Sequence, residues 1–280
     1  MNWLVTPGVR LSDRDLDFVV EQVAVDVEDR AGLRRLIQED EEFRKGFVGD
    51  PRVFDRLMSD DEAFISVSPA LYFEVLLRRA LTELGGTTHT VERMGSQSVP
   101  VFDAASVVDL LAQPGVLYYL ADMLGSFTRV RTSVTRVRVR RGLWRKVRYS
   151  DLDVSSLIQY ASTLDEQHRF PIYKRIGDVC LFILGVFPEH APSDRPHPLS
   201  GASLQATGSR MRRGAEEYEE DGRRFYLMAA GHATAKEMGI SVVLQTLHDD
   251  FGVARKPLTF LGEHYLRGIR RRMFGSEAAE

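Results

Sequence analysis

A run of basic residues near the middle of the chain is the strongest candidate for a binding site. No acidic residue occurs between Asp122 and Asp151, and the interval holds the basic residues Arg129, Arg131, Arg136, Arg138, Arg140, Arg141, Arg145, Lys146 and Arg148. The segment Arg140-Arg141-Gly142 suits a three-residue hairpin turn with its glycine in the left-handed region. This turn predicts a central basic β-hairpin in which Val139 lies opposite Leu143.

Strand alternation separates two faces of this predicted ribbon. One face is mostly apolar and carries Thr135, Val137, Val139, Leu143, Val147 and Tyr149, with Arg145 as the exception. The other face carries the candidate partner-binding residues Arg136, Arg138, Trp144, Lys146 and Arg148. We expect the first face to pack on helices and the second to point outward.

The chemistry of the second face suits an acidic partner. Arginine holds carboxylates and phosphates through paired hydrogen bonds, and an indole stacks on nucleic-acid bases. The simplest interpretation is a solvated face, or one that pairs with the chain's own acidic clusters, Asp60, Asp61 and Glu62 or Glu216, Glu217, Glu219, Glu220 and Asp221. Among binding functions, the leading hypothesis is a protein partner or acidic ligand, with nucleic acid as the alternative.

Three histidines near the C-terminus are candidate metal ligands. His232, His248 and His264 are evenly spaced, and His248-Asp249 resembles the central dipeptide of HD-type metal phosphohydrolases. That family also uses a later aspartate, and none follows Asp250. A metal-dependent hydrolase built on these histidines is therefore the third functional hypothesis, and the sequence predicts no metal or other cofactor.

Other catalytic patterns are absent from the sequence. It has no Gly-x-Ser-x-Gly nucleophile segment, no Walker loop and no Gly-x-Gly-x-x-Gly segment. The single cysteine, Cys180, lies in an apolar run, which predicts a core residue. Glu74 stands four residues before Arg78 in an apolar helix, so we interpret it as a structural ion pair. These observations favour a non-catalytic protein and leave an enzyme whose site has no local motif as the alternative.

Composition fits a globular protein with a packed core. The chain has 280 residues, of which 44% are hydrophobic and 28% charged, with a net charge of −3. This acidic balance disfavours a dedicated nucleic-acid-binding protein. The N-terminus lacks a secretory signal pattern, and no apolar stretch reaches the ~18 residues that a membrane span needs. We therefore predict a cytoplasmic protein that does not associate with membranes.

Helix signals dominate the remaining sequence. Ser68 and Pro69 begin a helix that is apolar almost all round and ends at Gly85-Gly86. Further helices are predicted at 29–38, 41–48, 103–111, 116–124, 151–161, 165–187, 215–238, 240–251 and 255–274. The segment 87–102 is expected to be irregular or extended. The fold class is therefore mainly α, a multi-helix globular bundle with one central basic β-hairpin.

Four prolines within residues 188–198 exclude regular structure there and suggest a boundary. The predicted organisation is an N-terminal helical region (1–125), a hairpin insert (126–150), a helical continuation (151–187), a proline-rich loop or linker (188–203) and a C-terminal helical unit (204–280). On this basis the functional hypothesis is a non-catalytic helical interaction or regulatory module that binds a protein partner.

Overall fold

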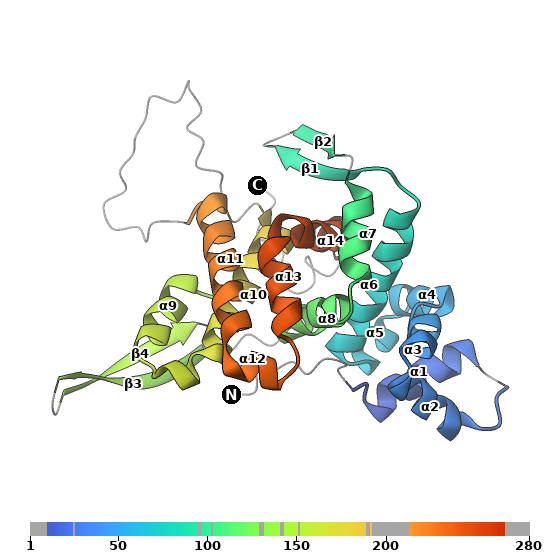
Figure 1. The fold of residues 1–280 in the computed structure, drawn as a ribbon. Helices are drawn as coiled ribbons and strands as arrows, with labels where there is room; N and C mark the ends of the chain where they lie inside the picture. The colour runs from blue at the N-terminus through green and yellow to red at the C-terminus, as the bar shows by residue number, and fades with distance from the viewer. Residues whose placement is uncertain are drawn as a thin grey trace.

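Helices build most of the molecule, as Figure 1 shows for the computed structural model. The structure describes residues 10–24, 26–94, 97–101, 103–128, 132–140, 143–150, 152–188, 191 and 213–266. Side-chain positions within 91–100 and 132–150 lie outside this description. The predicted mainly helical fold is confirmed.

Five short helices form the N-terminal end of the molecule (Figure 1). They are α1 (Asp13–Val23), α2 (Arg30–Glu39), α3 (Glu41–Val48), α4 (Pro51–Ser59) and α5 (Asp61–Ser66). An aspartate caps each of the last four, because its carboxylate accepts a hydrogen bond from a backbone N–H that the first turn leaves unpaired. Ser12 caps α1 in a capping box with Asp15. These closely spaced caps explain why the segment forms several short helices.

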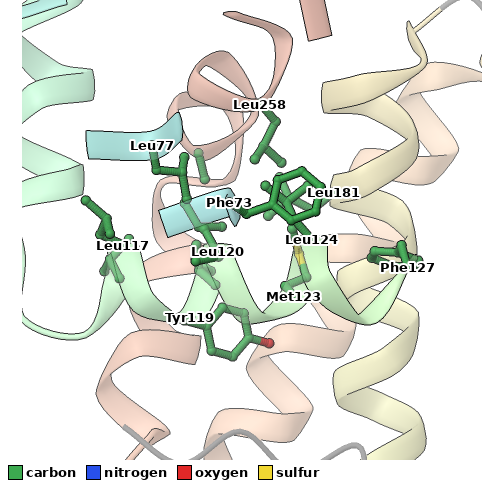
Figure 2. Packing of buried hydrophobic residues seen from close by; sticks show 14 of the residues in the cluster. Phe73, Leu77, Leu117, Tyr119, Leu120, Met123, Leu124, Phe127, Leu181 and Leu258 are labelled. Atoms are coloured by element: carbon green, nitrogen blue, oxygen red, sulfur yellow. The ribbon is translucent and has the colours of Figure 1, made fainter. Parts of the chain in front are cut away.

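Two apolar helices, α6 (Pro69–Gly85) and α8 (Val116–Ser126), pack together at the centre of the molecule. The Ser68 hydroxyl accepts from the Leu71 N–H, as the predicted cap requires, and Leu76 and Leu77 are fully buried. Figure 2 shows Leu117, Leu120 and Leu124 of α8 directed toward Phe73 and Leu77 of α6 and toward Leu181 and Leu258. The prediction of a buried central helix is confirmed.

Helix α7 (Ala104–Ala112) joins α8 through a sharp bend. Pro114 and Gly115 form it, and Gly115 has φ = 81°, a conformation that favours glycine. Together α7 and α8 have the length and composition of a membrane span, but they meet at 90°. Among the described residues, no single helix is long and apolar enough to cross a membrane.

The second half of the fold is organised around α10 (Phe170–Val186), which packs against α11 (Ala215–Gly231) and α14 (Phe251–His264). Helices α10 and α11 approach closely at Gly177, where a Cβ atom would lie 2.7 Å from the Tyr226 ring. Helix α13 (Ser241–Asp249) runs antiparallel to α11, because Ser241 Oγ donates to the Ala230 carbonyl and His248 contacts the Arg223 carbonyl at the other end. The remaining elements here are α9 (Val154–Ser162), the 3-10 turn η1 (Glu166–His168) and α12 (Ala233–Glu237).

Two antiparallel strand pairs accompany the helices. Strands β1 (Thr90–Met94) and β2 (Gln97–Val101) occupy the segment that the sequence predicts as irregular or extended. The sequence predicts one β-hairpin, and this second strand pair corrects that prediction. Strands β3 (Thr132–Arg140) and β4 (Leu143–Ser150) extend beside α9 at the edge of the molecule (Figure 1).

Three other predictions need correction or fall outside the description. The helix expected at 215–238 ends at Gly231, where His232 begins α12 by accepting from the Thr234 N–H. The helix expected from Arg255 begins earlier, at Phe251, and contains Pro257 in its interior. The proline-rich segment 188–203 lies almost wholly outside the described residues. One hydrophobic cluster extends from Leu11 to Leu266, so the helices on both sides of this segment share a core.

Candidate functional site

The register of β3 and β4 determines which of the candidate binding residues lie opposite one another. Arg136 pairs with Lys146 and Arg138 with Trp144, while Arg148 is opposite Val134. Residues at alternate positions of a strand belong to one face of the ribbon, so these positions lie on the same face. The side chains of all five candidates lie outside the described part, so an outward basic face stays a prediction.

The loop end of the ribbon differs from the sequence prediction. Leu143 pairs with Arg140, in place of the expected Val139, and the register shifts between Arg138 and Arg140. A shift of this kind arises when one strand accommodates an extra residue, as in a β-bulge. The expected pairing of Val139 with Leu143 is therefore corrected, and the turn residues 141–142 lie outside the described part of the chain.

Several members of the acidic clusters have basic partners close by in sequence. Asp60 pairs with Arg56 at 2.6 Å and caps α5, and Asp221 pairs with Arg213. Glu219 lies 3.7 Å from Arg223 on the same helix. These carboxylates are therefore partly neutralised by local contacts.

The three C-terminal histidines have separate surroundings. His232 Nδ1 accepts from the Thr234 N–H, so its Nε2 carries the proton and donates to the Glu166 carbonyl. His248 and His264 each use Nδ1 to bond a backbone carbonyl, of Arg223 and Phe260 respectively. Within the described ranges, no group of three His, Cys, Asp or Glu residues is placed to hold a metal. The described structure therefore does not bring these three histidines together at one site.

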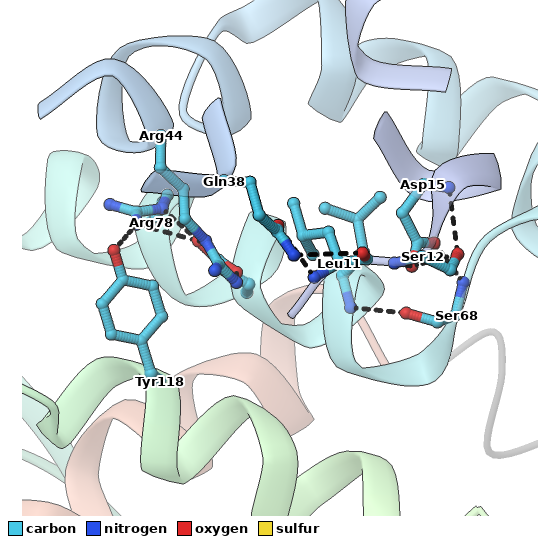
Figure 3. Close-up of polar contacts among 10 residues, drawn as sticks. Leu11, Ser12, Asp15, Gln38, Arg44, Ser68, Arg78 and Tyr118 are labelled. Atoms are coloured by element: carbon cyan, nitrogen blue, oxygen red, sulfur yellow. Dashed lines mark hydrogen bonds and ion pairs between the residues drawn. The ribbon is translucent and has the colours of Figure 1, made fainter. Parts of the chain in front are cut away.

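Glu74 belongs to a buried ion cluster, as its spacing from Arg78 predicts. Arg78 donates to Glu74 Oε1 from Nε and Nη2, at 3.0 and 2.8 Å. Arg44 of α3 donates to both carboxylate oxygens, at 3.1 and 2.6 Å. Figure 3 shows both arginines beside Tyr118, whose hydroxyl lies 3.0 Å from Arg78 Nη2. The cluster fastens α3 to α6 and α8, which supports the structural interpretation of Glu74.

A second buried polar cluster, absent from the sequence predictions, joins α8, α10 and α11. Asp178 Oδ1 accepts from the hydroxyls of Tyr119 and Tyr226, at 2.7 and 3.0 Å, and Oδ2 accepts from Lys174 Nζ at 2.7 Å. Asp178 is 1% exposed and Lys174 3%. We call these four residues the Asp178 cluster; they combine an ion pair with two phenol donors inside an apolar core.

Burial governs the ionisation of the tyrosines in this cluster. It raises the pKa of Tyr119 and of Tyr226 well above the ordinary phenol value, and the negative charge of Asp178 raises both further. Both hydroxyls therefore stay protonated and act as hydrogen-bond donors to Asp178. Burial likewise raises the pKa of the Cys180 thiol, so this fully buried cysteine is not an activated nucleophile.

The Asp178 cluster has a recognisable signal in the sequence. Lys174 and Asp178 are four residues apart and interrupt the apolar surface of a helix, as Glu74 and Arg78 do in α6. An ion pair at this spacing in a helix that is otherwise apolar indicates a buried cluster. The tyrosines come from α8 and α11 and are distant in sequence, so only the packing of three helices reveals them.

Comparison with known proteins gives no relative for this chain: no family model, no curated protein and no solved structure matches it.

Proposed function

We propose that this chain is a non-catalytic helical module that binds an acidic protein partner through the basic face of the β3–β4 ribbon. The observation that carries the proposal is the strand register, which pairs Arg136 with Lys146 and Arg138 with Trp144 in a segment without acidic residues. Like charges directly opposite one another destabilise a strand pair. A carboxylate-bearing partner relieves that repulsion, and the ribbon's place at the edge of the molecule leaves room for one (Figure 1).

Charge reversal on the ribbon tests this proposal. We expect the double substitution Arg138→Glu and Lys146→Glu to weaken binding of a fluorescein-labelled polyglutamate peptide by about tenfold or more, because two attractions become repulsions. Fluorescence anisotropy titrations at increasing salt concentration measure the affinity of each protein for the peptide. The difference between the two proteins should shrink as salt rises, because ions screen exposed charges.

A matched control separates the ribbon from the net charge of the protein. Arg14 and Lys236 are exposed residues of α1 and α12, and their joint replacement by glutamate changes the net charge by the same amount. This control should bind the peptide nearly as tightly as the wild-type chain. Equal losses in the two double variants would mean that the ribbon is not the binding site. Circular dichroism should show unchanged helix content in both, since exposed charges contribute only ~0–1 kcal/mol each to stability.

Single-stranded nucleic acid is the second candidate partner, favoured by the position of Trp144 opposite Arg138. Stacking of a base on an aromatic ring contributes ~1–3 kcal/mol. If nucleic acid is the partner, Trp144→Ala should weaken binding of a labelled oligodeoxythymidine by that amount and change polyglutamate binding little. The same anisotropy assay compares the two probes on one protein preparation. Tighter binding of the oligonucleotide that depends on Trp144 would replace the first proposal with the second.

A further inference from the structure

His232 contacts three elements where α11 ends. Its backbone N–H donates to the Ala229 carbonyl at 3.2 Å and completes the last turn of α11. Its ring Nδ1 accepts from the Thr234 N–H at 3.1 Å, which caps α12. Its ring Nε2 donates to the Glu166 carbonyl of η1 at 3.0 Å. One side chain therefore holds both α12 and η1 to the end of α11.

The two ring contacts of His232 require the neutral imidazole. A backbone N–H can only donate, so Nδ1 must keep its lone pair, whereas Nε2 must carry a proton to reach a carbonyl. The imidazolium has a proton on each nitrogen, so its Nδ1 would face the Thr234 N–H as a second donor. A second proton on the ring thus removes the cap of α12 and leaves the bond to Glu166 possible.

The other two C-terminal histidines use their rings in the opposite way. His248 and His264 each bond a backbone carbonyl through Nδ1, which therefore donates. That bond forms with the neutral ring and with the imidazolium alike. His248 Nε2 also lies 3.7 Å from Asp249 Oδ1, a contact that protonation strengthens. His264 is thus a matched control for His232, because its ring bond does not depend on a bare Nδ1.

The surroundings of His232 allow its ring to carry a positive charge. The C-terminal end of α11 and the face of Phe170, whose ring centre is 5.6 Å from that of His232, favour such a charge, and the N-terminal end of α12 opposes it. The Glu166 carboxylate pairs with Arg169 at 2.8 Å. The titratable and charged groups of the elements that meet here are Glu166, His168, Arg169 and Tyr173 from η1 and α10, and Lys236 and Glu237 from α12. The cost of the second proton therefore falls on the cap.

We propose that His232 is a pH-sensitive latch, which holds the first turn of α12 to the end of α11 when its ring is neutral and releases that turn when the ring takes up a second proton. Free histidine side chains take up this proton at about pH 6.5. Because the capped state has no place for a proton on Nδ1, protons favour the released state. The stability that the cap provides is therefore present above this pH and is lost as the pH falls below it.

NMR of the intact chain, with nitrogen labels in threonine and histidine, tests the latch directly. At pH 8 the His232 ring should show a bare Nδ1 and a protonated Nε2, and the His264 ring should show the reverse. The amide signal of Thr234, assigned with Thr234→Ser, should move between pH 8 and pH 5 together with the ring signals of His232. A Thr234 amide that does not change over this range, or a His232 ring with its proton on Nδ1 at pH 8, would overturn the proposal.

Thermal unfolding supplies the second readout. Asparagine also caps helices through a side-chain oxygen but does not titrate, so His232→Asn offers Thr234 an acceptor at every pH. Between pH 8 and pH 5, the unfolding midpoint of the wild type should fall by about 2–4 °C more than that of His232→Asn. His264→Asn should follow the wild type. Equal falls for the wild type and His232→Asn would refute the latch. If His232→Asn does not fold, the Thr234 amide of the wild type decides the question alone.

Discussion

Asp178 is a single residue that holds three helices, α8, α10 and α11, together through its side-chain contacts. Its carboxylate compensates the charge of the buried Lys174 and accepts from Tyr119 and Tyr226, which come from two other helices. A buried ion pair is costly to break because the remaining charge has no partner and no water. The residue is therefore more important for stability than its small size suggests.

Removal of the Asp178 charge should destabilise the protein strongly. We expect Asp178→Asn to lower the free energy of unfolding by about 3–5 kcal/mol, because it leaves the Lys174 ammonium buried without its counter-charge. Tyr226→Phe removes one hydrogen bond to the carboxylate and should cost about 1–3 kcal/mol. Urea denaturation followed by circular dichroism measures both. A loss below about 1 kcal/mol for Asp178→Asn would contradict the ion pair.

The buried tyrosines provide an independent test at alkaline pH. Tyr119, Tyr226 and Tyr72 have pKa values raised above 10 by burial. Because their folded pKa exceeds the unfolded one, the unfolded state releases these protons first, and stability falls as the pH rises above about 10. The phenolate absorbance of these residues should appear in one step that coincides with loss of the helical signal. Gradual ionisation in a fully helical protein would contradict their burial.

At the scale of elements, local signals predict helices well and strand pairs less well. Ser68, Pro69 and Gly86 delimit α6, and Pro114-Gly115 separates α7 from α8, because caps, prolines and glycines act on the backbone of their own segment. The β1–β2 pair was missed because its residues show no clear apolar alternation. The end of α11 at Gly231 was missed because His232 caps the next helix, a role the sequence does not reveal.

Close packing of α10 on α11 depends on a residue without a side chain. Gly177→Ala would place a Cβ atom 2.7 Å from the Tyr226 ring, which is itself bonded to Asp178. We expect a loss of about 1–3 kcal/mol from this overpacking. Gly46→Ala in α3 is the control: nothing lies within 4 Å of its Cβ position, so the change should stabilise the helix by about 0.5–1 kcal/mol. Equal effects at the two sites in thermal unfolding would show that the α10–α11 contact is looser than described.

At the scale of the whole molecule, the described residues form a hydrophobic cluster that includes residues from both sides of the proline-rich segment. Helices α11 and α14 both pack on α10, and α14 also contacts α6 and α7. A protein that ends at residue 203 would expose the apolar faces of α10 and α6. We expect this truncated chain to lack a cooperative thermal transition and to bind a hydrophobic dye, whereas the full chain unfolds in one step. A cooperative transition in the truncated chain would mean that the C-terminal unit is independent.

Trp144 reports most directly on the central claim, that the basic face of the ribbon binds an acidic partner. Replacement of Trp3 by phenylalanine leaves Trp144 as the only tryptophan, so the emission spectrum reports on the position opposite Arg138. Titration with unlabelled polyglutamate should produce a saturable change in Trp144 emission at low salt. The same titration should give no change when Arg138→Glu and Lys146→Glu are added. Binding of the peptide, detected by anisotropy, with Trp144 emission unchanged would place the binding site elsewhere and contradict the claim.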